Sequence, residues 1–471
     1  MKTFTNRLLM LRYENTIYVV FKGKIDMSHS PVTLEKPVTL EKIVSLCKRK
    51  GFVFPAADIY GGINGIYDFG HLGYLMKENI KNAWKKSIQN ELGDIFFLDG
   101  SLIGPQAMWI ASGHVENFHD PMIDCMNCKK RFRTDDDQID TNKPCPSCGI
   151  KSWTDIRDFN LMFQTQLGAL QDDSAKAYLR PETAQTIFVQ FKNVLTTNRA
   201  KIPFGIAQIG KSFRNEITPK QFLFRMREFE QMELEWFCKD ATSMETFEFW
   251  VEKRKAFYSS IGLDMNKIRM YQHPIEKLSH YSKCTIDVEY EFPFGFKELE
   301  GIAHRGTFDL TQHSKHSGKD LAIFDQETGL SEIPTVVETS VGVDRLFLTL
   351  LFDAYTEDEM DGETRVLLKL HPTIAPIKAA VLPLTKKISE NAEPLYKTLK
   401  KQFTNIDFDD SGSIGKRYRR QDEIGTPICF TFDFQSLEDN MVTVRHRDSG
   451  KQERIAIDQA AQYLENILKP S

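Results

Sequence analysis

Two cysteine pairs give the clearest chemical signal in the sequence. Cys125 and Cys128 form one Cys-x-x-Cys pair, Cys145 and Cys148 form another, and sixteen residues separate the two pairs. Four thiolates at this spacing are typical of a tetrahedral zinc site. Because four protein ligands leave no position for water, we expect a structural ion rather than a catalytic one. The sequence therefore predicts a zinc-binding, ribbon-like insertion at residues 121–150.

A second group of candidate residues alternates along residues 231–237. In a strand, Gln231, Glu233 and Glu235 would share one face, and the apolar residues between them would join the core. Just upstream, residues 206–216 place small and polar side chains on a common face: Gln208, Gly210, Ser212 and Arg214. Period-two alternation over residues 202–237 predicts antiparallel strands. A ligand could lie against this face of carboxylates and small polar groups.

The segment that joins these two strands carries arginines and aromatic rings. Arg225 and Arg227 follow Phe224, and Phe229 comes two residues later. Guanidinium forks suit phosphate oxygens, and aromatic faces suit a base. From this segment alone, a nucleotide site and a solvated hairpin with scattered charge both remain open.

Helical periodicity predicts the elements that position these residues. Apolar residues recur at helical spacing over residues 72–88, which predicts one long amphipathic helix, and a shorter helix is expected over residues 41–50. Residues 134–143 lack periodicity and are expected to form a surface excursion. Residues 355–364 are charged and turn-rich, so we expect a linker there. Beyond it, an apolar strand from residue 379 and helices near residues 390–403 and 458–468 predict a compact α/β domain.

Composition restricts the classes of function. The chain has 471 residues, 61 Lys+Arg against 65 Asp+Glu, and a formal charge of −4, so it cannot hold nucleic acid by bulk positive charge and must use local basic patches. It contains no run of 18 apolar residues, so we expect no membrane span. Eight dilute cysteines and the lack of signal-peptide features predict a cytoplasmic protein.

Several of these segments together resemble the dimeric-type glycyl-tRNA synthetases, a family of class II aminoacyl-tRNA synthetases. Residues 213–216 and 224–233 resemble motif 2 of that class. Residues 51–55 and 58–62 look like the family's N-terminal signature. The remaining matches are residues 72–88 with Pro105 to motif 1, 178–185 to the glycine-site segment, 336–345 to motif 3, and 416–427 to the anticodon-binding domain. The resemblance covers residues 41–471 and rests on several independent motifs.

The resemblance implies a two-step reaction. Glycine would attack the α-phosphate of ATP, releasing pyrophosphate, and the glycyl group would then pass to the 3′ end of tRNA(Gly). By resemblance, Arg214 binds the α-phosphate, Arg345 approaches the γ-phosphate and Glu298 contacts ATP and Mg²⁺; these three are the expected catalytic residues. The expected ATP site comprises Arg214, Asn215, Glu216, Phe224, Arg225, Arg227, Phe229, Glu298, Leu299, Arg305, Gly342 and Arg345.

Recognition of glycine should rest on carboxylates that hold its ammonium and leave no room beyond the α-carbon. Poor fit alone rejects an extra methyl by only ~1–3 kcal/mol, so fixed carboxylates would be the sharper device. The expected glycine-site residues are Arg133, Glu182, Phe229, Glu230, Gln231, Met232, Glu233, Glu338, Ser340 and Gly342. Thr186 stands where the family usually has Gly, and we expect it to crowd this segment.

The C-terminal part contains a local basic cluster with an aromatic ring. Its residues are Lys416, Arg417, Tyr418, Arg419 and Arg420. On composition alone this cluster would be a solvated loop, whereas the resemblance favours contact with the tRNA anticodon.

The predicted fold class is an α+β catalytic domain with an antiparallel sheet, a zinc-ribbon-like insertion and a C-terminal α/β anticodon-binding domain. We expect an N-terminal extension at residues 1–40, in which Met27 is a candidate true start, and catalytic segments at 41–120 and 151–360. The insertion occupies 121–150 and the anticodon-binding domain 365–471. The expected partners are glycine, tRNA(Gly) and a second copy of the chain, and the expected cofactors are ATP as substrate, Mg²⁺ and structural Zn²⁺.

Two rival interpretations remain. A non-catalytic relative that serves as a tRNA-binding or accessory module would be expected to lose ATP-site arginines, but Arg214, Arg225, Arg227 and Arg345 are all present. A synthetase for a larger amino acid would leave the carboxylates Glu182, Glu233 and Glu338 unpaired in its pocket, which is costly.

Overall fold

The computed structural model describes residues 38–469, except 135–138, 170–174, 279–281, 325–328 and 361, together with the backbone of four strands before residue 38. The chain forms two compact units, Met1–Thr39 and Leu40–Ser471. In the first unit, β2 (Thr16–Phe21) pairs antiparallel with β1 (Leu9–Tyr13), β3 (Lys24–Ile25) and β4 (Val32–Thr33). The predicted surface excursion falls partly on residues 135–138, which lie outside the described residues.

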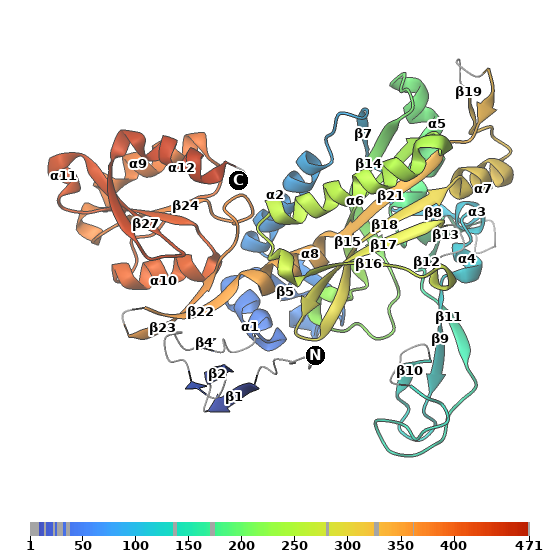
Figure 1. Cartoon of the computed structure of the whole chain (residues 1–471), viewed down its shortest axis with the longest axis horizontal. Helices are drawn as coiled ribbons and strands as arrows, with labels where there is room; N and C mark the ends of the chain where they lie inside the picture. Colours follow the sequence, from blue (N-terminus) through green and yellow to red (C-terminus); the bar gives the residue numbers. More distant parts are fainter. Residues whose placement is uncertain are drawn as a thin grey trace, which may run out of the picture. The chain divides into compact units, whose positions relative to one another are not determined.

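A seven-stranded sheet forms the centre of the second unit (Figure 1). Its strand order is β16-β17-β18-β21-β15-β14-β7, and only the β14–β7 pair is parallel. The strands are β16 (Ile268–Gln272), β17 (Cys284–Phe292), β18 (Gly295–Gly306), β21 (Thr335–Gly342), β15 (Glu228–Cys238), β14 (Phe204–Phe213) and β7 (Ile95–Leu98). The antiparallel strands predicted over residues 202–237 are thus confirmed.

Helices cover both faces of this sheet. On one face lie α2 (His71–Ser87), α6 (Ser243–Ser260) and α8 (Val343–Ala354); Trp236 of β15 packs there edge-to-face on Trp250 of α6, with ring centroids 5.3 Å apart. On the other face, α5 (Ala184–Thr197) and α7 (Phe308–Ser317) cover an apolar core that includes Phe204 and Phe237. Both faces of β15 are therefore buried, including the face that carries the carboxylates.

Smaller elements extend the second unit. A helix α1 (Leu40–Lys50) precedes the two-stranded sheet β5 (Val53–Pro55) and β6 (Tyr67–Phe69). A second small sheet has the order β12 (Gln164–Gln166), β13 (Lys176–Leu179), β8 (Ile103–Pro105). In the chain, β8 is followed directly by the helices α3 (Gln106–Ala111) and α4 (His114–Asn117). The insertion has the sheet β10 (Arg131–Arg133), β9 (His119–Asp124), β11 (Arg157–Asn160), and β19 (Ile323–Phe324) pairs with β20 (Ser331–Glu332). The helices predicted at residues 41–50 and 72–88 are confirmed.

The linker predicted at residues 355–364 is wrong, because this segment belongs to a β-hairpin. The strands β22 (Tyr355–Met360) and β23 (Glu363–Leu368) pair antiparallel, and Gly362 in the turn has φ +77°. Arg365 of β23 pairs bidentately with Asp358 of β22 and also contacts the buried Asp422. One of the charges that suggested a linker, Asp358, is therefore paired within the hairpin, whereas Glu359 and Glu363 are exposed.

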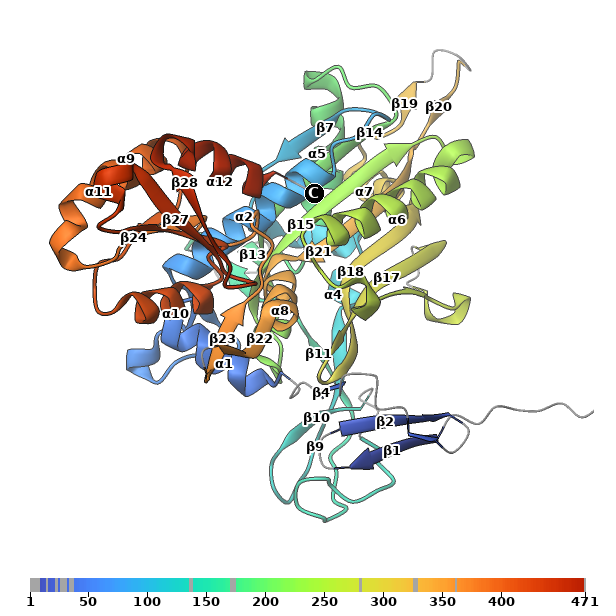
Figure 2. The same ribbon diagram turned by 60° about the vertical axis from the view of Figure 1, so that its left-hand side comes forward.

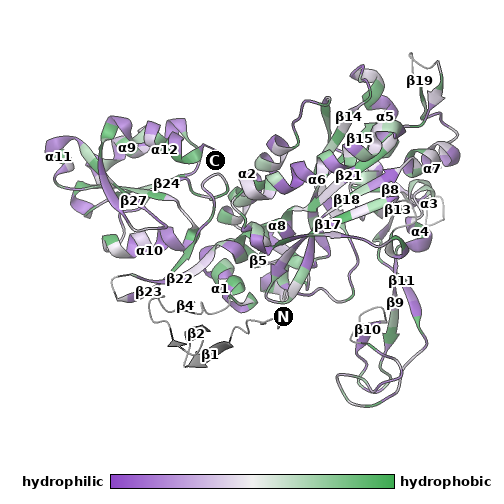
Figure 3. Ribbon diagram, viewed as in Figure 1, coloured by the Kyte–Doolittle hydropathy of each residue, from purple (hydrophilic) through white to green (hydrophobic). Residues whose placement is uncertain are grey.

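The C-terminal domain is a five-stranded α/β layer structure. Its sheet has the order β25 (Ile406–Phe408), β24 (Ala379–Pro383), β26 (Ile428–Phe432), β27 (Met441–His446), β28 (Gln452–Ala456). The helices α9 (Ser389–Gln402) and α12 (Ala460–Leu468) cover one face and α10 (Ile414–Ile424) the other (Figure 2), and α11 (Ser436–Asp439) precedes β27. Hydrophobic and hydrophilic residues alternate along these helices, as expected when one side is buried (Figure 3). The predicted α/β domain is confirmed, and no helix in the described part of the chain is long and apolar enough to span a membrane.

Candidate active site

A cavity of about 350 Å³ opens on the α5 side of the central sheet, at the ends of β15, β18 and β21. Twelve of the predicted site residues line it, from five separate segments of the chain. They are Arg133, Arg214, Glu216, Phe224, Arg225, Phe229, Gln231, Glu298, Leu299, Ser340, Gly342 and Arg345. The sheet thus brings together residues that are more than two hundred positions apart in the sequence.

The arginines of the cavity are held by aromatic rings and backbone carbonyls. Arg214 donates through Nε to the carbonyl of Pro181 at 3.1 Å, and its guanidinium lies 5.3 Å from the ring of Phe118 and 5.2 Å from that of Phe229. Arg345 donates to the carbonyl of Glu298 at 2.8 Å. Such contacts fix the charge while leaving part of each fork available to phosphate oxygens.

Arg133 and Arg225 add positive charge at the mouth of the cavity. Arg133, on β10 of the insertion, forms an ion pair with Asp120 at 3.0 Å. Both arginines also line an adjoining cavity of about 300 Å³ between the insertion and residues 216–225. The insertion therefore contributes directly to the walls of the candidate site.

Eight predicted site residues do not line the cavity: Asn215, the glutamates Glu182, Glu233 and Glu338, and four whose side chains point elsewhere, Arg227, Glu230, Met232 and Arg305. Glu230 and Met232 lie on the opposite face of β15, since neighbouring residues of a strand point to opposite faces. Glu230 pairs there with Lys77 at 3.0 Å. Arg227 donates to the carbonyls of Asn64 and Glu216, and Arg305 is buried beneath the sheet face. For all four, membership of a sequence motif concealed the direction in which the side chain points.

The three predicted glycine-site glutamates lie beneath the floor of the cavity. Glu233 is 2% exposed and accepts a hydrogen bond from the hydroxyl of Thr183. Glu338 accepts from Arg305 at 2.5 Å, and Arg305 also holds Asp309 through two bonds of 2.8 and 2.9 Å. Glu182 accepts from the amide of Gln185 at 3.1 Å. Gln231 and Ser340, whose side chains lie 3.4 Å apart, separate these carboxylates from the open cavity.

The three glutamates have different pKa values because each has different neighbours. Burial and the neighbouring carboxylates of Glu338 and Glu182 raise the pKa of Glu233 to about 8. Burial also raises the pKa of Glu338, and the Arg305 guanidinium opposes the shift. Burial works against the charged form of Glu182, yet His114 and Arg305 hold its pKa well below its usual range. A cation that binds among these glutamates would therefore meet Glu182, which is ionised, and Glu233, which would release a proton when the cation binds.

A buried polar network around Arg180 holds β14, the strand that carries Gly210 and Ser212. Arg180 donates to the carbonyl of Lys211 at 2.7 Å and to Oε1 of Gln208 at 2.8 Å. A Cβ on Gly210 would lie 2.2 Å from Nη2 of Arg180, so only glycine fits there. Thr186 does not crowd the segment as expected: its hydroxyl accepts from Gln208 at 2.7 Å and donates to the carbonyl of Thr183 at 2.8 Å.

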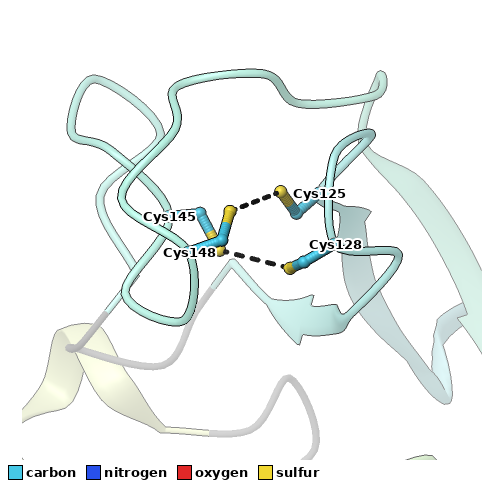
Figure 4. Close-up of side chains that lie close together, drawn as sticks. All are labelled: Cys125, Cys128, Cys145 and Cys148. Atoms are coloured by element: carbon cyan, nitrogen blue, oxygen red, sulfur yellow. Dashed lines mark hydrogen bonds between the residues drawn. The ribbon is translucent and has the colours of Figure 1, made fainter.

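The four cysteines of the insertion come together at the spacing of a metal site (Figure 4). The Sγ atoms of Cys125 and Cys148 lie 3.6 Å apart, and those of Cys128 and Cys145 lie 3.8 Å apart. Four Zn–S bonds of about 2.3 Å in a tetrahedron place neighbouring sulfurs about 3.8 Å apart, so the four thiols fit a zinc ion. A hydrogen bond from the Ile150 amide lowers the pKa of Cys148 to about 6, whereas at Cys128 a hydrogen bond from the Lys130 amide is outweighed by the neighbouring thiols, which raise the pKa of Cys128 to about 11.

Matching backbone turns hold the two cysteine pairs. In the first turn the amide of Lys129 donates to the carbonyl of Cys125, and in the second the amide of Gly149 donates to that of Cys145. Lys129 and Gly149 both have left-handed conformations, with φ of 59° and 72°. The insertion thus presents the two thiol pairs from two similar loops.

The basic cluster predicted at residues 416–420 is divided by its helix. Arg417 is buried and donates to the backbone carbonyls of Pro383, Leu384 and Asp409. The hydroxyl of Tyr418 shares a 2.5 Å hydrogen bond with Thr431, and the tyrosine packs against the domain core. The solvated loop expected from composition alone is wrong, because Ile414–Ile424 form the helix α10, whose successive residues point in different directions. Lys416 is exposed, Arg420 pairs with Asp409, and Arg419 donates to the carbonyl of Met360.

Some residues of the site were missed by sequence reasoning. Phe118, Asp120 and Asp344 line the cavity, and His114 lies 3.3 Å from Glu182. Asp344 precedes Arg345 directly and belongs to the recognised segment 336–345, so that match could have revealed it. The residues at 114–120 follow short helices with no recognisable pattern and gave no such signal.

Comparison with known proteins agrees with this geometry. Residues 163–357 match the family model described as "tRNA synthetase class II core domain (G, H, P, S and T)", and residues 378–467 match that of the "Anticodon binding domain". The chain is 52% identical over 450 residues to the glycine–tRNA ligase of Caldanaerobacter subterraneus subsp. tengcongensis, covering 90% of this chain and 97% of that protein. It is 51% identical to those of Alkaliphilus oremlandii and Thermobifida fusca, each time covering 90% of this chain and 97% of the relative.

A class II core, an anticodon-binding domain and half of all residues are thus shared with these enzymes along nearly their whole length. The chain belongs to the glycine–tRNA ligase family of class II aminoacyl-tRNA synthetases.

Proposed function

We propose that this protein activates glycine with ATP to form glycyl-adenylate and pyrophosphate, and then transfers glycine to the 3′ end of tRNA(Gly). The observation that carries the proposal is the position of the arginine-lined cavity directly above the buried carboxylates. Phosphate oxygens would meet Arg214, Arg225 and Arg345, and the ammonium of glycine would meet Glu233 and Glu338. A chain that had become a non-catalytic tRNA-binding module would have no need for either group.

The residues act by position and charge. Arg214 would bind the α-phosphate and neutralise the charge that develops as glycine attacks, since this displacement needs alignment rather than a protein nucleophile. Phe224 and Phe229 offer aromatic faces for adenine. Glu298, whose side chain is half exposed at the cavity, is placed to contact Mg²⁺, which supplies further neutralisation of the phosphates. Glu182, Glu233 and Glu338 would hold the ammonium, with Ser340 as a small polar wall.

We further propose that the protein binds zinc and forms a homodimer. The four cysteines of the insertion, Cys125, Cys128, Cys145 and Cys148, would hold one structural Zn²⁺ and so keep Arg133 at the cavity. A homodimer is supported by exposed apolar side chains on β7, β8 and α3, namely Phe97, Ile103 and Ile110, since β7 is the edge strand of the central sheet. We also propose that the protein works in the cytoplasm, where thiols stay reduced, since none of its eight cysteines, all of which the structure describes, forms a disulfide.

For tRNA, we propose that the domain at residues 365–471 binds the anticodon. Within the former cluster, exposed Lys416 and the partly exposed Arg419 and Arg420 are the residues available for phosphate contact. Arg417 and Tyr418 would support the helix from inside.

The test is ATP–pyrophosphate exchange without tRNA, run with each amino acid in turn. We expect exchange with glycine alone. At pH 9, where Glu233 is mostly ionised, Glu233→Gln should raise the glycine KM at least about tenfold, because losing one charged contact costs roughly 1.5–3 kcal/mol. The matched control is Glu228→Gln, the same substitution on the same strand, at a partly exposed pair with Lys211. No exchange with any amino acid, from folded protein that still binds tRNA(Gly), would refute the enzyme and favour the accessory module.

A further inference from the structure

Glu235 is a buried carboxyl with no partner. It lies on β15 two residues beyond Glu233, its exposed fraction is 0%, and neither carboxyl oxygen has a hydrogen-bond partner among the described residues. A buried ionised carboxylate without a hydrogen-bond donor costs free energy, so burial here favours the neutral, protonated form of Glu235. Sequence motifs gave it no role of its own.

The surroundings of Glu235 are strongly acidic. Glu233 adjoins it on the same strand, and Glu338 lies directly opposite on β21 in the strand register. One oxygen from each of these three carboxyls lies within 4.8 Å of the other two. Among the described residues, the other charged groups that face this region are Arg305 from β18, Asp309 from α7, Glu182 from the segment before α5 with its neighbour His114, and Arg180, whose charge acts on Glu233. Five carboxyls therefore surround two guanidinium groups, Arg305 and Arg180, and they cannot all be ionised in so small a volume.

The hydrogen bonds identify the carboxyl that keeps its proton after the others have ionised. Glu233 accepts from Thr183, Glu338 and Asp309 accept from Arg305, and Glu182 accepts from Gln185. Each of these donors favours the ionised form of its carboxyl. Glu235 alone in this group receives no hydrogen bond within the described part of the chain.

We propose that Glu235 is a neutral carboxylic acid that holds a proton beneath the amino-acid pocket and, as a donor to Glu233 or Glu338, positions the carboxylates that receive the ammonium of glycine. This inference rests on the proposed glycine site. Glu235 is a positioning residue, because Glu233 and Glu338 stand between it and the ligand. Burial and the Glu338 carboxylate raise the pKa of Glu235 well above its ordinary value, in agreement with this assignment.

The proposal distinguishes two glutamates that are only two residues apart. A neutral acid is mimicked by glutamine, which has the same shape and also donates, whereas an ionised ligand of the ammonium is not. At pH 9, Glu235→Gln should therefore keep the glycine KM within about threefold of the wild type, while Glu233→Gln should raise it at least about tenfold. Glu235→Leu, which removes the donor at similar volume, should raise the glycine KM with little change in the ATP KM.

Infrared spectroscopy of the full-length protein tests the proton directly, without reliance on activity. At pH 9 Glu233 is about nine-tenths ionised, so a carboxylic-acid carbonyl band that persists there, shifts in D₂O and is absent from Glu235→Gln belongs to Glu235. The Glu233→Gln variant should keep that band. The spectra need only folded protein, so they decide the proposal even where Glu235→Leu fails to fold.

Two results would overturn the proposal. One is a wild-type minus Glu235→Gln difference spectrum that lacks the acid band and shows the loss of a carboxylate instead. The other is a glycine KM in Glu235→Gln raised as far as in Glu233→Gln, which would make Glu235 a direct ligand. Failure of the wild type to activate glycine would refute the proposed function, and the infrared band would still decide whether Glu235 carries a proton.

Discussion

Capture of glycine should strengthen as pH rises through about 8, because Glu233 must ionise to receive an ammonium. The shift follows from burial and from the carboxylates of Glu338 and Glu182, which together raise the Glu233 pKa to about 8. A raised carboxyl pKa means that the ionised form is populated only as pH increases. At pH 7 about one-tenth of the molecules hold ionised Glu233 and at pH 9 about nine-tenths, so the glycine KM should fall about tenfold over this range.

The assay is ATP–pyrophosphate exchange at saturating ATP, with the glycine KM measured at half-unit steps of pH. In weakly buffered solution at pH 7, glycine binding should also release close to one proton per site. The Glu233→Gln variant should show a raised KM with no such fall, whereas Glu228→Gln should reproduce the wild-type curve. A flat wild-type profile, or an equal fall in Glu233→Gln, would refute the reasoning that Glu233 is the titrating acceptor.

Three further predictions concern stability and the insertion. Metal analysis should find about one zinc per chain, and Cys145→Ser should lose it and make the insertion sensitive to protease while the rest of the chain stays folded. Gly210→Ala should lower the free energy of unfolding, measured in urea, by about 1–3 kcal/mol, because the added Cβ would clash with Arg180. Gly415→Ala is the control, since its Cβ would have no atom within 4 Å and should leave the stability unchanged. Equal effects of the two substitutions would contradict the packing argument. Asp422→Asn, at a carboxylate that pairs with two buried arginines, should cost about 3–5 kcal/mol, and a cost below about 1 kcal/mol would show that the network is not stabilising.

The sequence predicted elements well where periodicity was long. The amphipathic helix over residues 72–88 and the paired strands of residues 202–237 both appear within a residue or two of their predicted ends. Alternation also indicated correctly that Gln231 and Glu233 share a face. These features depend on local spacing, which a sequence displays directly.

Other failures involve partners that are distant in sequence. Residues 355–364 looked like a linker because the contact between Arg365 and Asp422 is invisible in a local window. Arg417 looked like a surface cation for the same reason, although three carbonyls from elsewhere in the domain hold it. Likewise, sequence motifs assigned no role to Glu235, and only the strand register revealed how many acidic groups surround it.

The two buried faces of β15 restrict how this strand can change during evolution. Its odd-numbered residues face the candidate site, while Glu230 anchors its other face to Lys77 of α2. Inserting or deleting one residue within 228–238 would exchange the faces beyond that point, so carboxylates would meet the α6 core and tryptophan would meet the pocket. Homologues are therefore expected to vary in length at residues 215–227, between the strands, and to keep the length of β15 fixed. The strand can accept substitutions one at a time, but not a shift of register.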